Sequence, residues 1–144
     1  MTSAPDYRPW AIGELASVPR AVVELARARA MLGRIDPAAI ARLNADAQVV
    51  NGSPTGSAAI AQIARVLPSV AAVVPWRADC LVQALAARSW LRRKGVAGTI
   101  VLGVDRNSAG IEPHAWLRVG DTVVTGGPID RYAVLFDSDV QGDR

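Results

Sequence analysis

Cysteine and histidine are the scarcest reactive residues of this chain, with one of each among 144 residues, Cys80 and His114. A single cysteine excludes an internal disulfide and any zinc or iron–sulfur site that needs several thiolates. Aromatic residues are few as well, with one Phe, two Tyr and four Trp, which leaves no stacking platform for nucleic acid. Long hydrophobic runs are missing too. The most apolar segment, 66–76, contains Pro68 and Pro75 and is too short to span a bilayer.

The overall composition is typical of an ordinary globular protein. Apolar types make up 51% and charged types 20% of the sequence, so the chain is expected to fold as one domain rather than to be disordered. The net charge is +3, and Lys94 is the only Lys among sixteen basic residues. The one basic cluster, 88–94, falls at the end of a predicted helix, where positive charge offsets the helix dipole. We therefore predict no nucleic-acid partner.

The amino terminus has no secretory signal pattern, because neither a basic start nor an apolar stretch follows Met1. A reduced compartment also keeps a lone thiol available for chemistry. We therefore predict a cytoplasmic protein with no membrane attachment.

The first half of the chain is predicted to be helical, because apolar residues recur there at spacings of three and four. Proline is expected at helix starts and glycine at helix ends. These signals predict three helices and one loop: a helix between Pro19 and Gly33, a second from Asp36–Pro37 to about Ala47, a loop over 51–56, and a third helix from Ser57 to Leu67 that Pro68 ends.

The second half begins with a helix and continues with strands. The helix runs from about Ala78 to Arg93, is closed by Gly95, and carries apolar residues on more than one face, which indicates a buried central helix. Residues 105–110 are predicted as a loop, and Gly120 and Asp121 as a turn. The predicted strands are Thr99–Val104, Pro113–Val119 and Thr122–Thr125. The fold class is therefore α+β, with a helical N-terminal half and then a Cys-bearing helix packed on a small antiparallel sheet.

Cys80 and His114 together predict thiol chemistry. Cys80 falls at the start of the predicted helix, where unpaired backbone amides favour an anion and so stabilise the thiolate. His114 lies 34 residues later on a predicted strand, and an imidazole can accept and return a proton near pH 7. Each residue alone could be a packing residue, since Cys is often buried in a core. The ordered combination favours a nucleophile and its base.

These residues also carry a resemblance to a known family. The run WRADCLVQALAARSWLRRKGVAGTIVLGVDRN, 76–107, and EPHAWLRVGDTVV, 112–124, resemble the transglutaminase-like cysteine protease that removes the leader peptide in lasso peptide biosynthesis. The resemblance covers about Val74 to Phe136. It implies a transglutaminase-like or papain-like fold with Cys80 as nucleophile and His114 as base. It also divides the chain into a helical region 1–73, a catalytic core 74–136 and a polar tail 137–144.

The third catalytic residue departs from that family's pattern. Two turn residues at 120 and 121 would place residue 127 opposite His114. Many relatives carry Asp at about this place, where this chain has Gly126 and Gly127. We predict Asp130 as the third residue, reaching back through a bulge at the glycines. A backbone carbonyl that orients His114 is the alternative, and two other carboxylates are less suited: Asp79 as a helix cap and Asp121 as a turn residue.

The function implied by the resemblance is cleavage of a lasso precursor peptide by a cysteine endopeptidase without metal or organic cofactor. Its implied partners are the precursor peptide, a separate leader-recognition protein and the lasso cyclase. The alternative is a catalytically degenerate module that binds a peptide or partner protein. The amide of Cys80 is the expected first oxyanion donor. The sequence identifies no second donor: Gln62, Gln83 and Trp76 are conceivable, but each is more simply a surface or packing residue.

Overall fold

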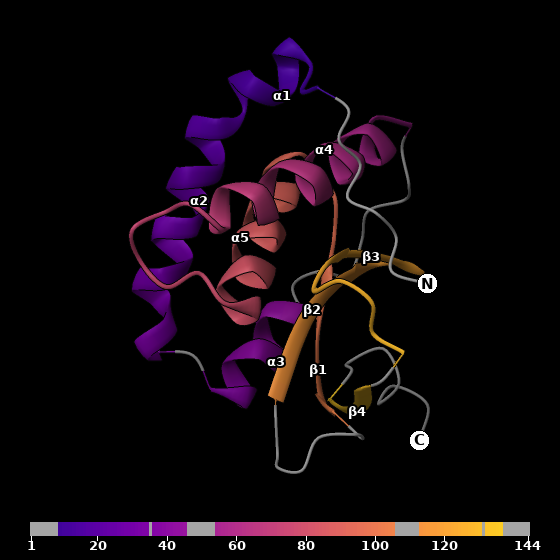
Figure 1. The fold of residues 1–144 in the computed structure, drawn as a ribbon. Helices are drawn as coiled ribbons and strands as arrows, with labels where there is room; N and C mark the ends of the chain where they lie inside the picture. The colour runs from indigo at the N-terminus through magenta and orange to yellow at the C-terminus, as the bar shows by residue number, and fades with distance from the viewer. Residues whose placement is uncertain (1–8, 35, 46–53, 106–112, 131, 137–144) are drawn as a thin grey trace.

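The computed structural model describes residues 9–34, 36–45, 54–105, 113–130 and 132–136. Within these ranges the chain forms helices first and then an antiparallel sheet, which confirms the α+β prediction (Figure 1). The elements are α1 Ile12–Ala16, α2 Val18–Met31, the short 3₁₀ helix η1 Leu32–Arg34, α3 Pro37–Ala45, α4 Pro54–Ala71, α5 Cys80–Arg93, β1 Thr99–Asp105, β2 Pro113–Val119, β3 Thr122–Thr125 and β4 Tyr132–Phe136.

Helix α5 is the centre of the core. It contacts α2 and α4 among the helices and packs on β2 of the sheet (Figure 1). Trp90 and Leu91 of α5 are buried together with Leu25 of α2, Ile63 of α4 and Leu117 of β2. Burying a large apolar side chain stabilises the fold by about 1.5–3 kcal/mol. This packing holds α5 between the helices and the sheet, as the apolar residues on more than one face of its sequence predict.

Both ends of α5 follow from local sequence. The Asp79 side chain caps the start and accepts a hydrogen bond from Val82 N at 3.2 Å. Gly95 follows the last turn with a φ of +74°, a conformation that costs glycine nothing. The capping role predicted for Asp79 is therefore confirmed. Of the basic residues near this end, Arg88 is buried and donates to Leu43 O at 2.5 Å, so it also joins α5 to α3.

The first half differs from its prediction at two places. Helix α4 begins at Pro54, inside the predicted loop, and runs through Pro68 to Ala71. Proline suits a first helical turn. The turn after Pro68 persists because Val70 is buried at 3% exposure and Ala72 N donates to Pro68 O at 3.1 Å. The free energy gained by packing this turn therefore exceeds the cost of the hydrogen bond that Pro68, which has no amide hydrogen, cannot donate.

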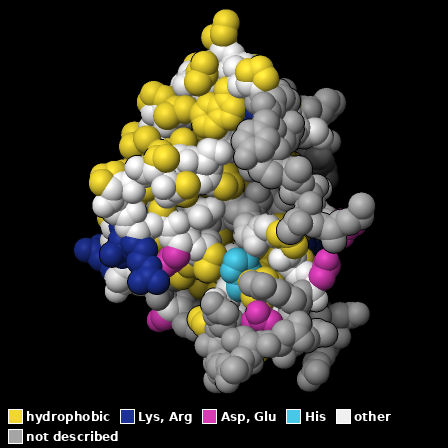
Figure 2. Space-filling model, viewed as in Figure 1, with side chains coloured by type: hydrophobic (Ala, Val, Ile, Leu, Met, Phe, Trp, Pro, Cys, Tyr) yellow, Lys and Arg dark blue, Asp and Glu magenta, His cyan; other side chains and the backbone are white. Residues whose placement is uncertain are grey.

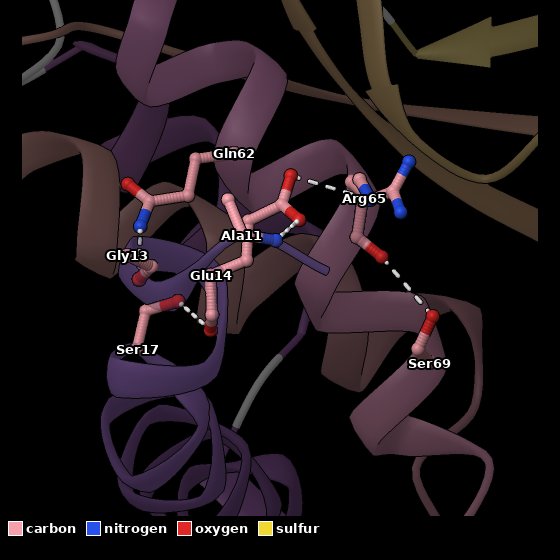
Figure 3. A network of polar contacts seen from close by, with 7 residues as sticks. All are labelled: Ala11, Gly13, Glu14, Ser17, Gln62, Arg65 and Ser69. Carbon is pink, nitrogen blue, oxygen red and sulfur yellow. Dashed lines mark hydrogen bonds and ion pairs between the residues drawn. The ribbon is translucent and has the colours of Figure 1, made fainter. Parts of the chain in front are cut away.

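Helix α1 was not predicted, because five residues are too few for a periodic pattern. Polar contacts to its own start and to α4 hold it (Figure 3). The carboxylate of Glu14 accepts from Ala11 N at 2.9 Å and forms an ion pair with Arg65 at 3.2 Å. Gln62 of α4 donates to Gly13 O at 3.1 Å. The contacts of α1 with Arg65 and Gln62 are tertiary and have no signature in the sequence.

The sheet has the strand order β3-β2-β1-β4, with every neighbouring pair antiparallel. The predicted bounds of β2 and β3 are confirmed, and β1 is one residue longer than predicted. Strand β4 was not predicted. It pairs with β1 rather than with β3, so it forms the other edge of the sheet. The β2–β3 register follows the predicted pairing as far as Arg118↔Val123 and then shifts, giving Leu117↔Thr125.

Some predictions concern residues outside the described ranges. These are the end of the second helix near Ala47, the loop residues 51–53 and 106–110, and the tail 137–144. In the part of the chain that the structure describes, no helix is both long and apolar enough to cross a membrane.

Candidate active site

An open cleft of about 530 Å³ lies where the start of α5 meets α4, β2 and the end of β3. Residues 64 and 68 of α4 and 123–124 of β3 supply apolar walls. The polar or reactive groups that line the cleft are those of Cys80, Gln83, His114 and Thr125 and the backbone of Gly126 and Gly127. Figure 2 shows the single histidine of the chain reaching the viewed face of the molecule. The fold thus brings residues 80 and 114, which are far apart in sequence, to one cleft.

Cys80 is the first residue of α5 and carries a free, half-buried thiol. The Asp79 cap uses the amide of Val82, and the amide of Gln83 donates to Asp79 O at 3.0 Å. The amides of the first turn before Val82 have no partner within the helix, as at any helix start. They leave positive partial charge beside the sulfur.

His114 is oriented by a backbone carbonyl. Its Nε2 lies 2.7 Å from the oxygen of Gly126. A carbonyl oxygen can only accept, so Nε2 must carry the hydrogen, and Nδ1 of the neutral ring is the nitrogen that can take a proton. This arrangement corresponds to the alternative that the sequence left open, a carbonyl in place of a carboxylate.

Glycine is required at position 126 for this contact. Gly126 has a φ of +102°, which side-chain-bearing residues rarely adopt, and a Cβ built there would lie 2.5 Å from Cβ of Trp116. Only a residue without a side chain can therefore lie over Trp116 and direct its carbonyl to His114.

The three predicted catalytic residues have different surroundings. Cys80 and His114 line the cleft together. Asp130 lies exposed in the turn before β4 and is not among the described residues that line the cleft. Asp121 is exposed in the β2–β3 turn. The role of Asp130 stays a prediction, and a substitution that tests it is given in the Discussion.

An aromatic residue that the sequence did not suggest contacts His114. The ring of Tyr132, from β4, stacks on the imidazole with centroids 4.3 Å apart and planes at 15°. Trp116, buried at 2% exposure, lies 6.0 Å from the imidazole and 6.1 Å from Tyr132. Gly103 of β1 pairs with His114, and a Cβ there would lie 2.9 Å from the Trp116 ring. The sequence feature that could have predicted the strand carrying Tyr132 is the apolar run YAVLF, which follows the turn residues GGP.

The three residues considered as second oxyanion donor lie in different places. Gln83 lines the cleft, and its amide Nε2 donates to Ala78 O at 3.0 Å. Gln62 contacts α1 and lines a different cavity. Trp76 has a buried indole nitrogen without a hydrogen-bond partner among the described residues, but it does not belong to the described lining of the cleft. Among the described residues, no group of three or more His, Cys, Asp or Glu could hold a metal ion.

Comparison with known proteins gives one match. The model of the transglutaminase-like superfamily matches residues 21–137, which is well over half of the chain. The chain belongs to the transglutaminase-like superfamily. The match includes Cys80, His114 and all four strands, and transglutaminase-like domains are often cysteine proteases. No similar protein was found among the curated proteins, and none among the solved structures.

Proposed function

We propose that this transglutaminase-like chain is a cysteine endopeptidase that removes the leader from a lasso precursor peptide. The observation that carries the proposal is the shared cleft of Cys80 and His114, in which the Gly126 carbonyl fixes the imidazole with Nδ1 available as a base. A nucleophile, a base and a group that orients the base are the parts that acyl transfer by a thiol requires.

The reaction follows from these groups. His114 Nδ1 takes the thiol proton, and the sulfur of Cys80 attacks the scissile carbonyl carbon. An S–C bond forms while the carbonyl π electrons move onto oxygen. The carbonyl then re-forms, the C–N bond breaks, and the imidazolium gives its proton to the departing amine. Water, activated by the same imidazole, attacks the thioester and releases the new carboxylate together with the free thiol.

The choice of a peptide substrate is supported by the shape of the site. The cleft is open, and its walls from α4 and β3 are small or apolar. Strand β3 is an edge of the sheet, so an extended peptide has a backbone partner available beside the thiol. The leader of a lasso precursor is proposed from the resemblance of 76–107 and 112–124 to leader peptidases. The partners proposed with it are a separate leader-recognition protein and the lasso cyclase.

The test is incubation of the purified chain with a lasso precursor peptide, with and without a separate leader-recognition protein. We expect two peptide products whose masses sum to the precursor plus one water. Cys80→Ala is the control, because the chain has no other thiol. A folded Cys80→Ala variant that keeps more than a tenth of the rate would refute the assignment. An amine adduct in place of hydrolysis would indicate a transferase.

Chemical reactivity of the thiol separates an enzyme from a degenerate binding module. In the proposed enzyme Cys80 should react with iodoacetamide faster at pH 7 than free cysteine does, because His114 is available in the same cleft to take the thiol proton. Reaction no faster than that of free cysteine would favour the binding module.

A further inference from the structure

The side-chain amide of Gln83 lies at the beginning of α5. Gln83 comes three residues after Cys80 and therefore shares its side of the helix. Helical side chains lean toward the N-terminus of their helix, and Gln83 does so, since its Nε2 donates to Ala78 O at 3.0 Å. Gln83 lines the cleft together with Cys80 and His114. Its amide is thus held beside the first turn, where the backbone amide of Cys80 also lies.

One hydrogen of this amide has no partner. A glutamine NH₂ group offers two hydrogens, and only the bond to Ala78 is found among the described residues. The bond to Ala78 holds the amide at the cleft, and its second hydrogen can be donated to a group bound there. A donor fixed in this way before the reaction is what stabilises charge that develops in a transition state.

We infer that Gln83 is the second donor of the oxyanion hole, and this inference rests on the proposed function. When the thiolate attacks, the carbonyl oxygen gains a full negative charge. The backbone N–H of Cys80 and the side-chain N–H of Gln83 each donate one hydrogen bond to that oxygen. Both bonds are strongest while the charge exists, so they lower the barrier to acylation rather than strengthen binding of the substrate.

The experiment compares two reactions of the same thiol. Acylation by p-nitrophenyl acetate passes through an oxyanion and releases p-nitrophenolate. Alkylation by iodoacetamide displaces iodide from a saturated carbon and forms no oxyanion. A group that stabilises only the oxyanion must therefore affect acylation and leave alkylation unchanged, whereas a group that merely holds the helix start would affect both.

Gln83→Met is the main variant, because Met is similar in length and has no donor. We expect acylation to fall at least tenfold, toward the roughly hundred- to thousandfold loss known for a single oxyanion donor, with alkylation within twofold of wild type. Gln62→Met is the matched control: that amide also donates to a backbone carbonyl, but it lies on α4 against α1 (Figure 3). It should change neither rate. Gln83→Leu provides a second variant, since it removes the donor without adding a charge beside the thiol.

Two results would overturn the inference while the proposed function stands. One is acylation within twofold of wild type in folded Gln83→Met or Gln83→Leu. The other is an equal fall in acylation and alkylation, which would make Gln83 a structural brace of the helix start. Wild-type acylation no faster than that of Cys80→Ala would instead refute the proposed function and the inference together.

Discussion

Replacing Gly126 by alanine tests the carbonyl that orients His114. The added Cβ must occupy space 2.5 Å from Trp116 Cβ and 3.1 Å from Trp116 Cα. Neither atom is the end of a flexible side chain, so the backbone itself must move. The φ of +102° adds strain of about 1–3 kcal/mol for a residue with a side chain, and overpacking a filled site adds about 1–3 kcal/mol. We therefore expect Gly126→Ala to lower the free energy of unfolding by about 2–6 kcal/mol, the sum of the two ranges.

Gly120→Ala is the matched control. Gly120 also has a positive φ, +56°, but a Cβ there meets no atom within 4 Å. Its substitution should cost only the conformational term of about 1–2 kcal/mol. Urea unfolding of the two variants, followed by circular dichroism, measures the difference between them.

The same pair of variants tests the site. Movement of residue 126 changes the 2.7 Å contact between its carbonyl and His114 Nε2. Alkylation of Cys80 by iodoacetamide at pH 7 should therefore slow at least tenfold in Gly126→Ala and stay within twofold of wild type in Gly120→Ala. The reasoning is refuted if the two variants lose equal stability and alkylate at equal rates.

Four further predictions concern the imidazole, its neighbours and a partner. His114→Ala should slow both peptide cleavage and alkylation of Cys80 at pH 7 by at least tenfold, and unchanged alkylation would show that the two residues are not coupled. If Asp130 is the third catalytic residue, Asp130→Asn should slow cleavage at least about tenfold, whereas the exposed control Asp121→Asn should cost less; a rate within twofold of wild type for Asp130→Asn would leave the Gly126 carbonyl, 2.7 Å from His114 Nε2, as the group that orients the imidazole. Tyr132→Leu removes the stacked ring and should slow alkylation several-fold, whereas Tyr132→Phe keeps the ring and should restore it, so that equal rates in the two variants would contradict a role for stacking. A separate leader-recognition protein should raise kcat/KM for the precursor at least tenfold by raising its effective concentration, and equal initial rates with and without that protein would mean that this chain binds the leader itself.

Sequence alone determined the elements whose signals are local. The start of α5 was predicted near Ala78, two residues before the observed first residue Cys80, and its end from Gly95. The bounds of β2 and β3 followed from extended apolar runs on either side of a Gly-Asp turn. A cap, a turn and an alternating pattern each act over a few residues, so they can be read without knowledge of the fold. The same locality made Cys80 recognisable as a thiol at a helix start.

Tertiary structure decided which groups meet at the cleft. The carbonyl that contacts His114 belongs to Gly126, and backbone carbonyls have no sequence signature at all. Tyr132 reaches the imidazole only because β4 pairs with β1, a pairing between segments about thirty residues apart. Pro68 lies inside a helix because buried neighbours hold the last turn. Each of these outcomes depends on packing between segments that are distant in sequence. The free energy of that packing exceeds the local conformational preferences on which a prediction from sequence relies.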